Sequence, residues 1–236
     1  MMRFGLAALV LSAALVSSVQ AAPPKKAPAH AAWLQTVVAT PEGGVRIGNP
    51  AAKVKLIEFG SRTCPHCAKF DAEGFPALKA SYIPSGQVSY EFRDFPIHGA
   101  LDLGPILLGH CVPVRAFFPI LDAMMTNQQT LVGRSDQVPD AKQKELAGAT
   151  PNAVATYLAQ FYGYTDLVVK HGLPLAKANA CLADRKSINT LVARTDAANK
   201  AYAVSSTPTF VLNGAAQASV NDWAGLEPLV RAALAK

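Results

Sequence analysis

Hydrophobic and polar residues alternate in two early segments that predict neighbouring strands of a sheet. Residues 54–59 (VKLIEF) carry apolar side chains on both faces, which is typical of an inner strand covered on both sides. In residues 86–95 (GQVSYEFRDF), Val88, Tyr90 and Phe92 alternate with polar residues. We therefore expect two strands here, joined by a crossover that contains a helix.

Helical spacing of apolar residues follows each of these strands. Residues 65–80 predict a helix that is kinked at Gly74 and Pro76. From about residue 100 to residue 202 the chain is rich in Ala and Leu, with prolines and glycines between the periodic segments. This pattern predicts five or six helices and no strand. Residues 223–234 predict an amphipathic helix that closes the chain.

Strand composition also occurs at both ends of the folded region. Residues 207–214 (TPTFVLNG) predict a strand that ends in an Asn-Gly turn, with residues 216–220 pairing back weakly. Residues 33–39 predict a short strand or a turn of helix, and residues 40–52 predict a loop. The order of elements makes the chain an α/β protein with a helical insertion.

The first residues have the pattern of an export signal. A short positive start, with Arg3, precedes an apolar run over residues 4–19 and a small-residue cleavage site that ends at Ala21. We interpret residues 1–21 as a signal peptide, with an uncleaved anchor as the alternative, and residues 22–32 as a flexible segment. The mature protein is then expected in an oxidising compartment outside the cytosol.

Charge and cysteine content narrow the function classes. The 236 residues carry a formal net charge of +6, but the basic residues are scattered without interleaved aromatics, so we expect no nucleic-acid partner. The four cysteines are Cys64, Cys67, Cys111 and Cys181. An even count in an exported protein fits two disulfides, and four cysteines allow three pairings.

The Cys64-Pro65-His66-Cys67 stretch lies where the first strand passes into a helix. A cysteine at a helix start meets unsatisfied backbone N–H groups and the positive end of the helix dipole, which lower its pKa and stabilise its thiolate. Pro65 suits the first helical position because it lacks an N–H. His66 adds a donor or partial positive charge, and Arg62 is a further nearby cation.

Other chemistry at these cysteines has weaker support. Haem attachment needs CxxCH, but Ala68 follows Cys67. A zinc site needs two more ligands, whereas Cys111 and Cys181 are isolated from any second CxxC or HxxxH. We therefore expect no metal and no cofactor, and we interpret the pair as redox-active.

The stretch EFGSRTCPHCAKF resembles the active site of DsbA-type thiol–disulfide oxidoreductases, the thioredoxin-fold enzymes of the bacterial periplasm. The resemblance also covers the helical insertion and VSSTPTFVLNG near the end. It implies a thioredoxin-like domain over residues 33–99 and 203–236, with an inserted all-helical domain over residues 100–202. It also implies a periplasmic location.

The resemblance also assigns roles to individual residues. Pro208 matches the cis-proline of the family, and with Thr207 it forms the loop that offers backbone groups to an extended peptide substrate. Threonine at position 207, where the best-known DsbA enzymes have valine, is similar to the disulfide isomerases. Glu58 matches an acidic residue below the buried cysteine, with proton exchange with Cys67 as its role and an ordinary strand glutamate as the alternative.

The remaining two cysteines lie in helical contexts. A Cys111–Cys181 bridge would close a loop of about 70 residues and contribute about 4 kcal/mol to stability. Two buried free cysteines are the alternative. His110 beside Cys111 is interpreted as a packed or surface histidine.

The sequence as a whole predicts a protein-disulfide oxidoreductase that donates its Cys64–Cys67 disulfide to reduced, unfolded exported proteins. A membrane reoxidant of the DsbB type and a monomeric state are expected as well. The alternatives are a disulfide isomerase or reductase of the same fold, and a non-catalytic thioredoxin-like chaperone or metal carrier.

Overall fold

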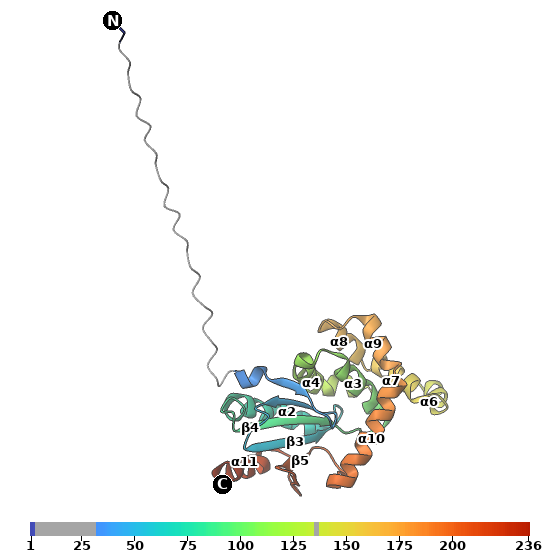
Figure 1. The fold of residues 1–236 in the computed structure, drawn as a ribbon. Helices are drawn as coiled ribbons and strands as arrows, with labels where there is room; N and C mark the ends of the chain where they lie inside the picture. The colour runs from blue at the N-terminus through green and yellow to red at the C-terminus, as the bar shows by residue number, and fades with distance from the viewer. Residues whose placement is uncertain (3–31, 135–136) are drawn as a thin grey trace.

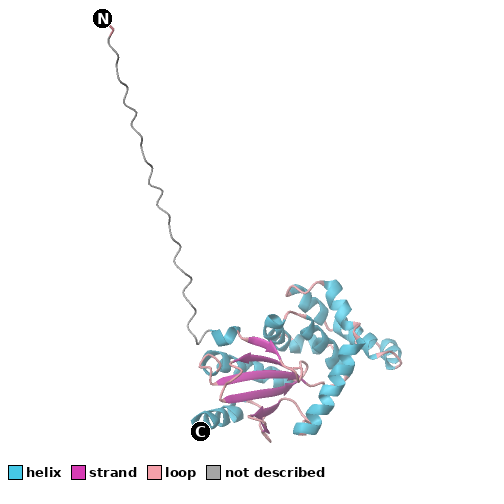
Figure 2. Cartoon of the chain, in the orientation of Figure 1, coloured by secondary structure: helices cyan, strands magenta, loops and turns pink. Residues whose placement is uncertain are grey.

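The computed structural model describes residues 1–2, 32–134 and 137–236. Residues 3–31, which include most of the predicted signal peptide and of the predicted flexible segment, lie outside the described residues. The described chain forms a twisted sheet with helices packed around it, and a larger group of helices lies beyond one end of the sheet (Figures 1 and 2).

The sheet has six strands in the order β1-β2-β4-β3-β5-β6. The strands are β1 (Val37–Ala39), β2 (Val45–Gly48), β3 (Val54–Gly60), β4 (Val88–Asp94), β5 (Thr209–Leu212) and β6 (Ala215–Ala216). Only β3 and β4 pair in parallel, and every other neighbouring pair is antiparallel. The two strands predicted by the early alternation are therefore the centre of the sheet.

Strand β2 corrects the prediction of a loop over residues 40–52. Val45 and Ile47 are buried and pair with Phe92 and Tyr90 of β4. A four-residue strand between two turns is too short to give a periodic signal, and it forms because the neighbouring strand β4 supplies its hydrogen bonds and its apolar contacts. The turn that precedes β2 contains Gly43, whose φ of 91° suits glycine.

One face of the sheet carries the larger part of the core. The helices on this side are α2 (Pro65–Ala77), continued by a π-helical turn η2 (Leu78–Tyr82), α4 (Phe117–Thr126) and α11 (Trp223–Ala235). Phe70 of α2 packs 4.7 Å from the ring of Phe210 in β5. The predicted kink corresponds to Pro76 inside α2 and to the π-helical turn that follows.

Most of the remaining helices pack on one another rather than on the sheet. They are α3 (Ala100–Cys111), η3 (Val114–Ala116), α5 (Gln128–Val132), α6 (Asp140–Ala147), α7 (Pro151–Phe161), α8 (Tyr164–Lys170), α9 (Leu175–Leu182) and α10 (Arg185–Tyr202). A short helix η1 (Trp33–Gln35) precedes β1. Five or six helices were predicted for this region. The count is too low because several helices are short and separated by only one or two residues, such as Asn127 or the pair Tyr162 and Gly163.

Helix α10 links this helical group to the second face of the sheet. Its residue Ala198 packs with Phe59 of β3 and Val211 of β5. The α/β architecture with inserted helices that the sequence predicted is therefore confirmed. Among the described residues, no helix combines the length and the apolar composition that a membrane span requires.

Candidate active site

Cys64 lies at the junction between the central strand β3 and helix α2. Strand β3 ends at Gly60, and Cys64 is the N-cap residue of α2 with an extended backbone. Pro65 occupies the first helical position, where its missing N–H is no loss. Cys64 is 6% exposed and Cys67 is fully buried, so the first cysteine is the one nearer to solvent. Both are free thiols.

A loop from the far end of the chain covers Cys64. The Cys64 thiol donates to the carbonyl oxygen of Thr207, with 3.2 Å between Sγ and O. The Thr207–Pro208 peptide bond is cis. The hydroxyl of Thr207 is buried and has no hydrogen-bond partner among the described residues, so it is free to donate to a thiolate at position 64.

The two cysteines have opposite acidities. The pKa of Cys64 is lowered to about 5, mainly because the Cys67 thiol donates a hydrogen bond to the Cys64 sulfur. Burial opposes this lowering. The Thr207 side chain and the backbone N–H groups of Cys67 and His66 lower the pKa further. Burial is the main cause that raises the pKa of Cys67 well above its ordinary value. At neutral pH the reduced site therefore holds a thiolate at Cys64 and a thiol at Cys67.

His66 acts on Cys64 through its backbone. Its side chain is exposed and makes no hydrogen bond to any residue that the structure describes, whereas its N–H stabilises the Cys64 thiolate. Lys69, one turn further along α2, is also exposed and lies near acids on the surface, with 4.0 Å to Glu73 and 3.8 Å to Asp222.

Glu58 is buried beneath the helix start at 1% exposure. Its Oε2 accepts a hydrogen bond of 2.6 Å from the Tyr90 hydroxyl of the neighbouring strand. Burial raises the pKa of Glu58 to about 8, although the bond from Tyr90 counteracts the rise. When Glu58 is ionised, its negative charge adds to the rise in the pKa of Cys67, of which burial is the main cause. At neutral pH the Glu58 carboxyl is protonated.

A polar network that sequence reasoning missed holds the turn before Cys64. The hydroxyls of Ser61 and Thr63 each donate to Oδ1 of Asp102 at 2.8 Å, and the N–H of His98 donates to Oδ2 at 2.8 Å. Ser61 then uses its backbone N–H to donate to Cys67 Sγ at 3.4 Å. Asp102 is fully buried, and burial raises its pKa. The signal available in the sequence was the position of Asp102 among the apolar residues of α3, which indicates a buried carboxylate.

A glutamine that sequence reasoning missed also supports this turn. Gln128 lies at the start of α5 and is 4% exposed. Its Nε2 donates to the carbonyls of Arg62 at 3.0 Å and Cys64 at 3.1 Å. These bonds join the helical group to the backbone on both sides of Thr63.

Arg62 was expected beside the reactive sulfur, but its side chain points elsewhere. Its guanidinium is fully buried and forms two hydrogen bonds with Asp94, of 2.6 and 3.1 Å. The guanidinium carbon also lies 4.9 Å from the centre of the Phe117 ring. His110 Nε2 lies 2.8 Å from the second oxygen of Asp94. Arg62 therefore joins the turn before Cys64 to the end of strand β4.

Cys111 and Cys181 form a disulfide that joins α3 to α9, with 6.1 Å between their Cα atoms. The bridge closes a sequence separation of 70 residues and lies within the helical group, away from Cys64. In the described part of the chain, no cluster of three or more His, Cys, Asp or Glu side chains has the geometry to hold a metal ion.

Comparison with known proteins identifies the family. A family model described as "Thioredoxin" matches residues 40–232, which is most of the chain. The chain belongs to the thioredoxin family. The match covers the strands around Cys64, the helical group and the Thr207–Pro208 loop, so this thioredoxin-family protein carries its helices as an insertion between β4 and β5.

A curated relative carries a related name. The "Putative protein-disulfide oxidoreductase" of Rickettsia bellii is 30% identical over 173 residues, which are 73% of this chain and 58% of that protein. A similarly named protein of Rickettsia prowazekii is 30% identical over 168 residues, which are 71% of this chain and 53% of that protein. The chain thus spans little more than half the length of these relatives.

Solved structures share the whole fold. A protein-disulfide isomerase from Novosphingobium aromaticivorans has a TM-score of 0.75 and 31% identity, and the match covers 81% of this chain and 97% of that chain. The α-DsbA1 protein of Wolbachia pipientis has a TM-score of 0.62 and 20% identity, with 80% and 90% covered. At that lower identity the Wolbachia structure supports the fold alone.

Proposed function

We propose that this protein is a periplasmic protein-disulfide oxidoreductase that donates its Cys64–Cys67 disulfide to reduced, unfolded exported proteins. The observation that carries the proposal is the opposite acidity of the two thiols, with a pKa of about 5 at Cys64 and a raised pKa at buried Cys67. A stabilised Cys64 thiolate favours the reduced form of the pair, which makes the disulfide form a strong oxidant.

The reaction begins at the oxidised pair. A substrate thiolate attacks Cys64 Sγ, since Cys67 is fully buried. The Cys64–Cys67 bond breaks, a mixed disulfide forms between substrate and Cys64, and Cys67 leaves as a thiolate. A second substrate thiolate then attacks the substrate sulfur of the mixed disulfide, and Cys64 leaves as a thiolate. The substrate is oxidised by two electrons, and the protein becomes the dithiol.

Glu58 is the proposed proton donor for the leaving Cys67. Its pKa of about 8 keeps the carboxyl protonated at neutral pH, and a thiol whose pKa is raised well above its ordinary value takes up a proton when it is released. In the reductive direction Glu58 returns as a base and accepts the proton of Cys67 as that thiol attacks the mixed disulfide.

The Thr207–Pro208 loop is the proposed substrate-binding element. The carbonyl oxygen of Thr207 lies 3.2 Å from Cys64 Sγ, so a substrate cysteine that bonds to Cys64 arrives beside the backbone of this loop and can pair with it as an added strand. Reoxidation by a membrane partner of the DsbB type and a monomeric state complete the proposal.

Two measurements on the purified protein test this function. Thiolate absorbance of the reduced protein against pH should titrate near pH 5 and should lose that transition in Cys64→Ala. A redox titration against glutathione should give a potential well above that of thioredoxin, about −270 mV. A Cys64 pKa near its ordinary value together with a thioredoxin-like potential would refute the proposal.

A disulfide isomerase is the second candidate, favoured by the 31% identity to the Novosphingobium aromaticivorans protein of that name. Both candidate functions use the same two cysteines, so the assay has to distinguish net oxidation of a substrate from rearrangement of its existing disulfides. A scrambled substrate with all its cysteines paired reports isomerisation, and a reduced unfolded substrate reports oxidation. Recovery of native pairing from the scrambled substrate without net oxidation of the reduced one would favour the isomerase.

A further inference from the structure

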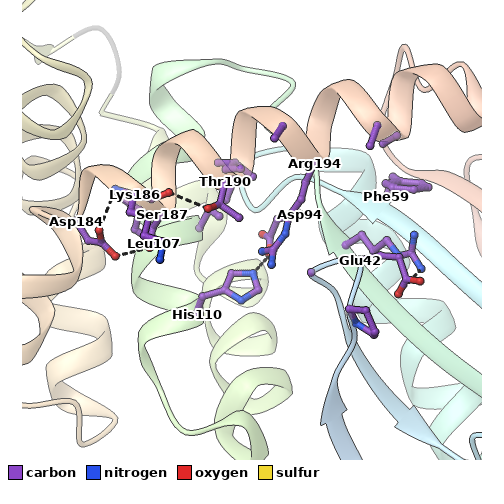
Figure 3. A pocket seen from close by; sticks show the side chains of 18 of the residues that line it. Glu42, Phe59, Asp94, Leu107, His110, Asp184, Lys186, Ser187, Thr190 and Arg194 are labelled. Atoms are coloured by element: carbon purple, nitrogen blue, oxygen red, sulfur yellow. Dashed lines mark hydrogen bonds and ion pairs between the residues drawn. The ribbon is translucent and has the colours of Figure 1, made fainter.

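A cavity with a volume of about 640 Å³ lies away from the two redox cysteines. It is lined by α10, α3, the β1–β2 turn and the end of β4 (Figure 3). Cys64, Cys67 and Thr207 are absent from its lining, and the Cys111–Cys181 bridge closes one part of it. Its volume lies within the range of sites for small organic ligands, about 300–1,000 Å³.

The acidic side chains in the cavity wall already have partners. Asp94 is bonded to buried Arg62 and to His110. Glu42 lies 3.7 Å from Arg93. Asp184 caps α10, where its two oxygens accept from the backbone N–H of Lys186 and the hydroxyl of Ser187. These carboxylates are therefore neutralised or satisfied within the protein.

Two basic side chains in the same wall are left over. Arg194 and Lys186 of α10 form no ion pair within 4.0 Å with any acidic residue that the structure describes, although the charge of Lys186 acts on Asp184 two residues before it. The Arg194 guanidinium rests against Gly43, where its atoms occupy the space that a side chain at position 43 would need. Figure 3 shows Arg194 extending from α10 toward the side chain of Asp94.

The remainder of the lining is largely apolar. Leu191, Ala198 and Tyr202 lie with Arg194 along one face of α10, and Phe59 and Leu107 approach from β3 and α3. Leu191 and Phe59 are buried, so these walls are fixed by the core rather than by mobile surface side chains. An apolar chamber with a free arginine and a free lysine complements a molecule with an apolar body and one anionic group.

We propose that this cavity is a binding site for a small amphipathic organic anion, whose apolar body lies along α10 and whose carboxylate, sulfonate or phosphate group meets Arg194 and Lys186. The site is distinct from the proposed redox chemistry, because no redox residue lines it. Arg194 and Lys186 favour anions over neutral molecules of the same shape. The apolar wall favours molecules with a long apolar body over small ions.

Calorimetric titration of the purified protein with matched probes tests this site. Decanoate should bind at one per protein, decanol should bind more weakly, and acetate should not bind in the same concentration range. Octanoate should bind more weakly than decanoate, since each buried methylene adds about 0.8 kcal/mol at most, or about fourfold in affinity. Decyl phosphate and decyl sulfonate, used below their micelle concentrations, identify the preferred anionic group.

Variants locate the site. Arg194→Gln should weaken decanoate by about three- to tenfold and leave decanol unchanged. Ala197→Trp fills the cavity from an exposed position of α10 and should abolish both. Arg185→Gln removes the same charge from an exposed residue of α10 outside the cavity and should change nothing. Absence of saturable decanoate binding, or binding that Arg194→Gln and Ala197→Trp leave intact, would overturn the proposal.

Discussion

The buried pair of Arg62 and Asp94 makes a sharp prediction about stability. Replacement of Asp94 by asparagine keeps the shape of the side chain but removes its charge. The Arg62 guanidinium is fully buried, and the Asp94 side chain is 2% exposed, so no solvent replaces the lost partner. We expect Asp94→Asn to lower the free energy of unfolding by about 3–5 kcal/mol, as for a broken buried pair.

The magnitude follows from which charge is left behind. Two hydrogen bonds of 2.6 and 3.1 Å are weakened, and the rings of Phe117 at 4.9 Å and Phe92 at 5.8 Å continue to face the cation without replacing the carboxylate. A matched exposed pair is Lys69–Glu73, whose side chains are 53% and 50% exposed and 4.0 Å apart. Glu73→Gln should cost less than about 1 kcal/mol, since water solvates the lysine.

The effect should also depend on pH. Burial by itself raises the pKa of Asp94, but Arg62 and His110 outweigh it and leave the pKa at about 2, below the ordinary 3.8. A lowered pKa contributes stability that is complete above 3.8 and is lost as the pH falls toward 2. The difference between the natural protein and Asp94→Asn should therefore be about 1 kcal/mol smaller near pH 3 than near pH 5.

Urea unfolding at matched redox state measures these differences. A third variant, Arg62→Met with Asp94→Leu, removes both charges and should be more stable than Asp94→Asn alone, because no buried charge is left unpaired. The reasoning fails if Asp94→Asn costs no more than Glu73→Gln, or if the double variant is less stable than the single one.

Three further predictions concern the disulfide, the buried acid and a packed glycine. Replacing Cys111 and Cys181 together by alanine should lower the free energy of unfolding by about 4 kcal/mol, since a 70-residue loop regains its freedom in the unfolded chain. The rate of insulin reduction should stay unchanged. A loss of stability below about 1 kcal/mol in urea unfolding would contradict this prediction. Glu58→Gln should slow insulin reduction by up to about a hundredfold and remove the inflection near pH 8 from the pH–rate profile of the reaction. The control Glu73→Gln should keep that inflection. An unchanged profile in Glu58→Gln would argue against proton transfer by Glu58. Gly109→Ala should lower the free energy of unfolding by about 1–3 kcal/mol, because the new Cβ would meet the buried guanidinium of Arg62. Gly148→Ala is the control: open space surrounds position 148, so the melting temperature should stay nearly unchanged.

The central elements were predictable because each has a strong local signal. The strand over residues 54–59 and the alternation of Val88, Tyr90 and Phe92 correspond to β3 and β4. Strand β2 was missed because four residues carry too little periodicity, and its existence depends on a partner more than 40 residues away. The number of inserted helices was underestimated because short helices end without proline, as at Asn127.

The surroundings of the site were harder to predict than the cysteines themselves. The CPHC spacing indicates the reactive pair, but nothing local indicates that Asp102 would accept from both Ser61 and Thr63. Arg62 was expected near Cys64 because it is a neighbour in sequence. Its direction is set by Asp94, the last residue of strand β4, so only the tertiary fold decides which way the Arg62 side chain points.

The position of Thr207 has a consequence for when the protein becomes reactive. Cys64 and the carbonyl of Thr207 are 143 residues apart in sequence, and central strand β3 lacks its neighbour β5 until residues 209–212 exist. During synthesis from the N-terminus, the CPHC pair therefore emerges long before the loop that covers it. A nascent chain presents Cys64 without the Thr207 side chain, which helps to lower the pKa of Cys64 in the folded protein, so the thiol reaches its full acidity only when nearly the whole chain has folded.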